Sequence, residues 1–314
     1  MEAKAANGKR TVKKKTSRQG YQYFFYIIPG LVLVFLFAYK PIAGWIYAFT
    51  DYKAGMSWDK VNYVGFVNFS RMFANPALRA QVAQVMVNTF AMVGLNQLIG
   101  PLSMIFAIFL NEMTSKGTRR VVQTITTLPH FISWVIMYSI VYYMLSNSGF
   151  VNTVLQRIGA INMPINFLAT ADNTYIKMFF YSVWKGLGWG AIVYLAAIGG
   201  IDQEQYEAAM IDGAGRLQRI WHITVPGLLP TFFVLFIMGI GNFLNTGMEQ
   251  YYVFQNAMNK EYIQVLDLYV YNQGIGQGNI PYATAVGMLK SLVALVLFAF
   301  ANRVSRAVRG TSVF

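Results

Sequence analysis

Long apolar stretches alternate with short polar ones along this chain. Six stretches are almost entirely apolar, near residues 24–47, 84–110, 122–145, 175–199, 227–248 and 283–301. At about 1.5 Å of rise per residue, a helix over each stretch is long enough to cross a hydrocarbon layer of about 30 Å. The pattern therefore predicts an all-α polytopic membrane protein with six transmembrane helices.

Composition agrees with a membrane location, and the charges add an orientation. Hydrophobic residues make up 56% of the chain and charged residues 12%, against about 25% charged residues in soluble domains. Of the 25 Lys and Arg, 15 fall in tails and loops on the side of the N-terminus and six in loops on the other side. This bias predicts that the N- and C-termini are both cytoplasmic. The basic charge is therefore explained by topology, and we expect no nucleic-acid partner.

The predicted organisation is one membrane domain between two tails. Residues 1–23 form a basic cytoplasmic tail that we expect to be disordered. Residues 24–301 form the transmembrane domain, and residues 302–314 form a second cytoplasmic tail. The first apolar stretch is too long for the core of a signal peptide, so we interpret it as a retained anchor.

Proline and glycine positions predict local features of the crossings. Pro29 and the Lys40-Pro41 pair are expected to kink the first crossing. Segment 49–83 is rich in aromatic residues, which predicts a short helix at the membrane interface. In crossing four the run GLGWG at 186–190 predicts close helix packing, because small residues let helices approach each other in lipid.

A polar stretch, EAAMIDGAGRLQRIWHITVP at 207–226, separates crossings four and five. Asp202 is expected to cap a helix that Gly213 ends in the left-handed conformation. A second short helix carries Arg216 and is expected to stop at Pro226. An amphipathic surface anchor is one interpretation, but an acidic face with an alanine pair favours a protein partner over lipid.

The spacing within this stretch resembles the EAA loop of ATP-binding-cassette (ABC) importer permeases. That loop reads EAA, three residues, Gly, nine residues, then I-x-L-P, and here Val225 replaces the leucine. The matching residues are Glu207, Ala208, Ala209, Gly213, Ile223 and Pro226. The segments TLPHFISWVI, ITVPGLLPTF and YATAVGMLKSLV are similar to the LplB-like polysaccharide/oligosaccharide permeases of the carbohydrate uptake type 1 family. Leu268 departs from that group, where Thr is expected.

This resemblance implies a type I ABC importer transmembrane domain. Its coupling helix would lie within residues 201–222, inside an EAA loop that spans 201–226. The ATPase-coupling residues would be Glu207, Ala208, Ala209, Asp212, Gly213, Arg216 and Pro226. The implied partners are a second, homologous permease, two ABC ATPase subunits that bind ATP and Mg, an extracellular or periplasmic solute-binding protein, a glycan substrate and the lipid bilayer. The implied location is the bacterial cytoplasmic (inner) membrane.

Polar residues at the end of crossing five suggest a path for the solute. Asn242, Asn245, Thr246 and Glu249 recur at i, i+3, i+4 and i+7, which places them on one helical face. Such groups are costly in lipid and normally face a cavity or another helix. In the maltose-type permeases a matching Asn-x-x-Asn contacts the sugar, and the resemblance carries that role to Asn242 and Asn245. Hydrogen bonding to the second permease is the alternative.

Aromatic residues in crossings three and four raise the same question. His130, Trp134, Tyr138 and Tyr142 are spaced by four, which predicts one aromatic stripe. The stripe could line a sugar path or could pack against a neighbouring helix. The same alternatives apply to the tryptophans of crossing four, Trp184 and Trp189. Two lysines within the crossings, Lys185 and Lys290, could pair with Glu249 or with an acidic sugar.

The sequence carries no catalytic constellation. It has no cysteine, and its two histidines, His130 and His222, have no carboxylate at metal-ligand spacing. We therefore expect no metal site and no cofactor, and His222 is expected at the membrane surface. No GxxxxGK[ST] loop occurs, so ATP must bind to another subunit.

The predicted function is thus a permease subunit of an ATP-driven importer of oligosaccharides or polysaccharide fragments. The alternative is a stand-alone secondary transporter or channel for a polar solute, which would need coupling charges or broken helices in paired halves. A membrane-embedded enzyme has no residues to support it.

Overall fold

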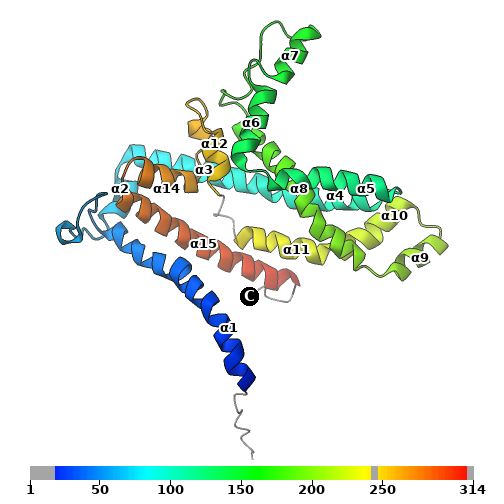
Figure 1. The fold of residues 1–314 in the computed structure, drawn as a ribbon, viewed down its shortest axis with the longest axis horizontal. Coiled ribbons are helices and arrows are strands. Elements are labelled where there is room, and N and C mark those ends of the chain that lie inside the picture. The colour runs from blue at the N-terminus through cyan, green and yellow to red at the C-terminus, as the bar shows by residue number, and fades with distance from the viewer. Residues whose placement is uncertain (1–17, 242–246, 310–314) are drawn as a thin grey trace, which may run out of the picture. The chain divides into compact units, whose positions relative to one another are not determined.

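The computed structural model describes residues 18–241 and 247–309, and helices dominate these ranges (Figure 1). The α-helices of the described ranges are α1 (Arg18–Val34), α2 (Val67–Ala74), α3 (Pro76–Gln97), α4 (Ile99–Asn111), α5 (Lys116–Thr127), α6 (Trp134–Leu145), α7 (Phe150–Arg157), α8 (Thr174–Gly199), α9 (Gln203–Ile211), α10 (Arg216–Arg219), α11 (Val225–Gly241), α12 (Glu249–Phe254), α13 (Lys260–Ile263), α14 (Leu266–Tyr271) and α15 (Ile280–Arg309). Shorter 3₁₀ helices are η2 (Lys40–Phe49), η3 (Trp58–Lys60) and η4 (Leu128–Phe131), and π-helical turns are η1 (Phe35–Tyr39), η5 (Ile220–Thr224) and η6 (Asn272–Gly276).

The described residues contain four to six candidate membrane spans. Four helices are long and apolar enough to cross a bilayer, namely Tyr21–Phe49, Pro76–Asn111, Arg216–Ile240 and Ile280–Phe300. Two bent pairs bring the number to six if each is one span. The pairs are Lys116–Phe131 with Trp134–Arg157, bent by 110°, and Thr174–Gly199 with Gln203–Ile211, bent by 71°. These helices follow the six apolar stretches of the sequence.

The chain divides into two parts, residues 1–47 and 48–314. In the first part α1 begins at Arg18, so residues 18–23, which we assigned to the tail, are helical. Pro29 lies within α1, and the geometry changes to a π turn and a 3₁₀ helix around Lys40. That change is where the Lys40-Pro41 pair was expected to disturb the helix, because proline removes a backbone donor. At the other end of the chain, α15 continues to Arg309, past the crossing that we ended at residue 301.

Three apolar clusters form the core of the second part. The Phe254 cluster consists of Met92, Val141, Met178, Tyr181, Tyr251, Phe254, Ile263, Val265 and Leu268. The Tyr282 cluster consists of Ala48, Met72, Val85, Leu266, Tyr269, Tyr282, Ala285 and Val286. The Tyr194 cluster consists of Ala107, Ile108, Ala191, Tyr194, Ile198 and Leu228. Since α14 supplies residues to the first two clusters, it lies between them.

The glycines of α8 allow close packing, as the GLGWG run predicts. A Cβ on Gly188 would overlap the backbone of Thr126, and one on Gly190 would lie 2.5 Å from the Ser103 hydroxyl oxygen. These glycines therefore let α8 lie directly against α4 and α5, and the three helices run side by side in Figure 1. The expectation of helix packing is confirmed at both positions.

Buried polar side chains of α3 hold the segment that follows crossing five. The Asn88 side chain is fully buried and donates to the carbonyls of Glu261, at 2.7 Å, and Gln264, at 3.0 Å. The neighbouring Thr89 hydroxyl accepts from the amide of Leu266 at 2.9 Å. Because buried backbone groups need partners, these bonds fix the loop before α14 against α3.

Candidate coupling unit and solute path

The polar stretch between crossings four and five folds as two helices around a glycine. The Asp202 carboxylate accepts from the Glu204 amide at 3.0 Å and caps α9. Gly213 has φ +77°, a conformation that costs an L side chain energy. The Ala214 amide then donates to the Ala209 carbonyl at 2.8 Å and closes the end of the helix. The expected cap and glycine stop are confirmed.

Pro226 does not stop the second helix, and that expectation is wrong. After α10 (Arg216–Arg219) the chain passes through the π turn η5 directly into α11, and Pro226 is the second residue of α11. Proline is accommodated there because the π turn η5 directly before it already interrupts the regular i to i−4 hydrogen bonds of the helix. The polar unit is therefore continuous with crossing five, and both belong to the candidate span Arg216–Ile240.

The surface of this unit is exposed within the chain. Helix α9 buries none of its residues, and Glu207 and Ala208 are both exposed. Beside them, exposed fractions reach 87% for Ile211 and 71% for Leu217. In Figure 1, α9 and α10 lie at one end of the second part, away from α12 and α14. A projecting helix with exposed apolar side chains and a carboxylate is suited to a protein partner.

One contact ties the unit to the rest of the bundle and another joins α9 to η5 within the unit, and sequence reasoning found neither. The Arg216 guanidinium lies 3.5 Å from the Glu112 carboxylate and donates to the Glu112 carbonyl at 3.2 Å. The hydroxyls of Tyr206 and Thr224 are hydrogen-bonded at 2.9 Å. One signal was available, because Glu112 is the single acidic residue of a loop that is otherwise basic. Asp212 is exposed and follows the last residue of α9.

The aromatic stripe of crossing three does not include His130, contrary to expectation. His130 belongs to η4, and α6 begins only at Trp134, after a bend of 110°. The His130 ring stacks instead on Trp189, with centroids 4.3 Å apart. Proline at 129 favours such a break. Lys185 supports it by donating to the carbonyls of His130, at 3.0 Å, and of Ile132.

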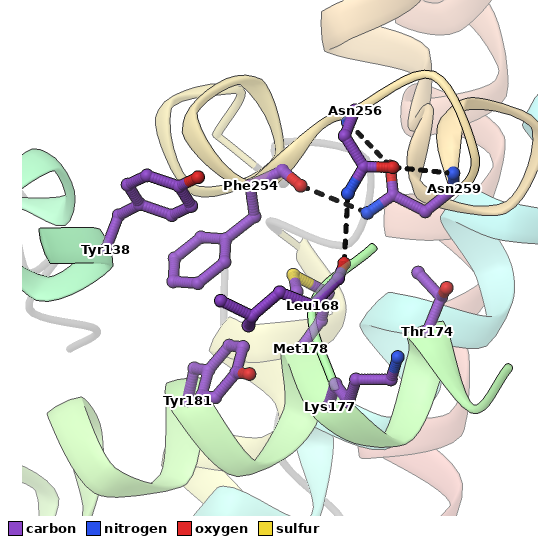
Figure 2. Close-up of a pocket in the computed structure, with 9 residues that line it drawn as sticks. All are labelled: Tyr138, Leu168, Thr174, Lys177, Met178, Tyr181, Phe254, Asn256 and Asn259. Carbon is purple, nitrogen blue, oxygen red and sulfur yellow. Dashed lines mark hydrogen bonds between the residues drawn. The ribbon is translucent and has the colours of Figure 1, made fainter. Parts of the chain in front are cut away.

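Two residues predicted to line the solute path are partly buried and pack against the core, which was the alternative that the sequence left open. The rings of Trp134 and Tyr138 approach Phe254 edge-on, with centroids 6.5 Å and 5.1 Å away. Tyr138 also borders the pocket of Figure 2, whose volume of about 30 Å³ holds little more than a water molecule. The side-chain oxygens of Asn256 and Asn259 each accept from the backbone amide of the other residue, and their side-chain nitrogens donate to backbone carbonyls. The pocket is therefore too small for a sugar ring in this state.

Of the remaining path residues, the structure describes Trp184, Trp189 and Glu249. The tryptophans of crossing four, Trp184 and Trp189, are 41% and 45% exposed. Asn242, Asn245 and Thr246 lie outside the described residues. Glu249 is the first residue of α12, and Gly247, two residues before it, has φ +67°, which breaks a helix at that point. The expectation that Glu249 continues the helical face of crossing five is therefore wrong.

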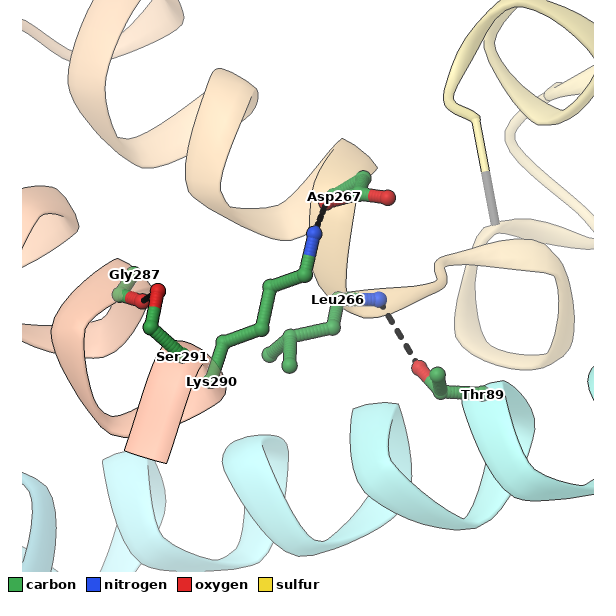
Figure 3. A network of polar contacts seen from close by, with 6 residues as sticks. All are labelled: Thr89, Leu266, Asp267, Gly287, Lys290 and Ser291. Atoms are coloured by element: carbon green, nitrogen blue, oxygen red, sulfur yellow. Dashed lines mark hydrogen bonds and ion pairs between the residues drawn. The ribbon is translucent and has the colours of Figure 1, made fainter. Parts of the chain in front are cut away.

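The two membrane lysines differ in their partners, because Lys185 interacts electrostatically with Glu249 and Lys290 pairs with another carboxylate. Lys290 forms an ion pair with Asp267 on α14 (Figure 3), a partner that the sequence did not indicate. Lys185 binds backbone carbonyls and lies 5.3 Å from the centre of the Trp134 ring.

His222 is exposed within η5, with its Nδ1 2.9 Å from the Gln218 carbonyl. Among the described residues, no group of three or more His, Asp or Glu could hold a metal ion.

Comparison with known proteins identifies the family. Residues 99–310 match the family of binding-protein-dependent transport system inner membrane components. The chain belongs to this family. It is 39% identical to Protein LplB of Bacillus subtilis strain 168, over 90% of this chain and 88% of that protein. It is 37% identical to the polygalacturonan/rhamnogalacturonan transport system permease protein YteP of the same organism, over 93% of this chain and 89% of that protein.

A solved structure supports the same fold. A chain of a bacterial ABC transporter involved in the import of the acidic polysaccharide alginate superposes with a TM-score of 0.82. The two chains are 34% identical, and the match covers 93% of this chain and 97% of the other. The predicted all-α fold of an ABC importer transmembrane domain is confirmed.

Family membership fixes the general role of the chain. This binding-protein-dependent permease is a multi-pass inner-membrane subunit of an ABC importer, and ATP is bound by separate ATPase subunits. The chain itself is not an enzyme. The alternative of a stand-alone secondary transporter or channel is therefore set aside.

Proposed function

We propose that this permease imports oligosaccharides or polysaccharide fragments. Support comes from the relatives, since YteP is described as a polygalacturonan/rhamnogalacturonan permease and the superposed structure as an alginate importer. Both relatives match the chain over nearly all of its length. The solute would be delivered by a binding protein on the side of the membrane opposite the termini, which we place in the cytoplasm.

The partners in this proposal are a second, homologous permease and two ABC ATPase subunits. The observation that carries the coupling role is the unpacked helix α9, which exposes Glu207, Ala208 and Ile211 together. We propose that α9 docks in a groove of an ATPase subunit and that Glu207 contacts a basic residue there. The Gly213 turn would set the angle between α9 and α10.

Movement of the ATPase would reach the membrane along a continuous path. Helix α10 passes through η5 into α11 without a loop. A displacement of the docked unit would therefore move crossing five as well. Such transmission is what alternating access between two permeases requires.

The coupling role is tested by two substitutions in the docked unit. Glu207→Arg reverses the charge that faces the partner, and Gly213→Pro cannot adopt φ +77° because proline fixes φ near −65°. Both variants are expected to remain in the membrane and to lose most ATP-driven uptake in proteoliposomes.

Two matched controls accompany them. Gln205→Arg adds a cation elsewhere on α9, and Gly215→Ala changes a glycine whose φ of −69° suits any residue. Both controls are expected to retain uptake. Unchanged uptake in Glu207→Arg and Gly213→Pro would contradict the coupling role.

The substrate class is tested separately with the cognate binding protein. A glycan array should give binding to oligosaccharides, with no comparable binding of peptides or amino acids. A tight peptide ligand, with no glycan bound, would overturn the sugar proposal and leave the coupling proposal intact.

A further inference from the structure

Lys290 and Asp267 form an ion pair at membrane depth. Lys290 lies in the candidate span Ile280–Phe300, ten residues after the start of α15. At about 1.5 Å per residue, this position is roughly 15 Å into the helix, near the middle of a hydrocarbon layer of about 30 Å. The side chains are only 16% and 22% exposed. Charged groups at such depth are costly and commonly mark a solute or ion pathway.

Lys185 provides a comparison, because its hydrogen bonds give its ammonium a structural role. The Lys185 ammonium has three N–H donors, and the carbonyls of Pro129, His130 and Ile132 accept from it. All of its donors are therefore used at the break before α6. Lys290 differs, because among the described residues its ammonium has the Asp267 carboxylate as its one acceptor. It keeps donors for a further ligand.

The two partners of the pair differ in mobility. Asp267 lies on α14, whose neighbouring residues Leu266 and Leu268 are 2% and 0% exposed in two different clusters. The Leu266 amide is also bonded to Thr89, as Figure 3 shows. The carboxylate is thus held in place, while Lys290 reaches it through a flexible four-carbon chain. When the pair opens, it is the ammonium that moves.

The helix surface one turn before Lys290 is uncovered by the described chain. Gly287 lies three residues before it on α15, on the same helical face. A Cβ added to Gly287 would meet no atom of the described chain within 4 Å. The open volume therefore lies along α15 beside the base of the Lys290 side chain, while the ammonium at its other end contacts the Asp267 carboxylate.

We propose that Lys290 is a specificity residue that binds the carboxylate of an acidic sugar, and that Asp267 is its resting counter-ion. This inference rests on the proposed glycan function and narrows it to uronate-containing oligosaccharides. A solute carboxylate presents to the ammonium the same group that Asp267 presents, so the two compete for it. Competition keeps the solute from being held too tightly, since a transported ligand must both enter and leave.

The test measures import by the complete complex in proteoliposomes with its binding protein. The probes are trimers of galacturonate and of alginate, each beside its carboxyl-reduced, neutral counterpart. Lys290→Met is expected to lower the ratio of acidic to neutral import by roughly 10- to 100-fold, as expected for a lost charge-assisted hydrogen bond. Lys290→Arg keeps a cation at this position, so the ratio of acidic to neutral import should stay close to the wild-type value.

The Asp267→Asn variant tests whether Asp267 competes with the solute carboxylate for Lys290 or only stabilises the structure. Without its competitor, Lys290 should hold the acidic trimer more tightly, so that both KM and kcat for that trimer fall. A structural pair predicts a different result, in which the double variant Asp267→Asn/Lys290→Met restores acidic import to the wild-type rate. Restoration of that kind, or an equal loss of acidic and neutral import in Lys290→Met, would overturn the proposal.

A zero-length carbodiimide cross-link provides an independent measurement. In the resting complex the reagent should join Asp267 to Lys290, and mass spectrometry should find that peptide pair. During transport of an acidic trimer, the Asp267–Lys290 link should decrease and a glycan amide should form on Lys290. A wild-type complex that imports only the neutral trimers would overturn this inference but leave the proposed function standing, whereas import of no glycan would overturn both.

Discussion

At the scale of single residues, close packing in the membrane part leaves no space for a larger side chain at some positions. The α8 glycines show this most clearly, because they differ in what surrounds them. Gly188 lies against the backbone of Thr126, whereas a Cβ on Gly186 would lie 3.5 Å from a methyl group of Ile99, an ordinary contact. The two positions are half a turn apart on the same helix and provide a matched pair.

Substituting these glycines should have opposite effects on stability. Gly188→Ala must push α5 away from α8, and overpacking of this kind costs roughly 1–3 kcal/mol. Gly186→Ala should be neutral or stabilising by up to about 1 kcal/mol, since alanine favours the helix over glycine. Thermal melting of the purified complex in detergent compares the two. Equal melting temperatures for the two variants would contradict the packing described.

At the scale of elements, the segment after crossing five depends on polar contacts with α3. Asn88 replaces the partners that the carbonyls of Glu261 and Gln264 would find in water. Helix α14, which carries Asp267, follows directly and is fixed through Thr89. A loop of this kind gains its order from a neighbouring helix, because its own short helices supply few internal hydrogen bonds.

Loss of Asn88 should therefore loosen that segment. Asn88→Ala leaves two buried carbonyls without donors and should destabilise the segment by roughly 2–4 kcal/mol. Hydrogen exchange of the amides near residues 261–266 should accelerate in this variant. Gln84→Ala is the control, because Gln84 donates to the Asn88 side-chain oxygen and leaves the Asn88 donors in place. If both variants exchange at the same rate, Asn88 does not hold the segment.

At the scale of the whole molecule, the sequence predicted features that depend on neighbouring residues. It did not predict contacts between segments that are distant in the sequence. The apolar stretches predicted the crossings, and the offsets around Gly213 predicted the helix, turn and helix unit. The pairing of Lys290 with Asp267 could not be predicted, because it depends on how α14 is inserted between two clusters. The stop assigned to Pro226 failed because the π turn η5 before it accommodates the proline within a continuous helical path.

The contact between Glu112 and Arg216 joins the coupling unit to another loop and can be tested at this scale. The two side chains are 31% and 60% exposed, so the pair contributes about 0–1 kcal/mol to stability. Arg216→Glu should leave the melting temperature nearly unchanged but lower ATP-driven uptake several-fold, because the unit is no longer attached to the end of α4. The charge-swapped double variant Glu112→Arg/Arg216→Glu should recover uptake. A double variant no better than the single one would argue against the attachment.

The unbroken passage from α10 into α11 has a mechanical consequence. The span Arg216–Ile240 contains 25 residues, so it is about 37 Å long. If this helical span pivots near Arg216, a tilt of about 10° displaces the opposite end by about 6 Å. A small rotation imposed by the ATPase would therefore displace the far end of this helix by about the width of a sugar ring.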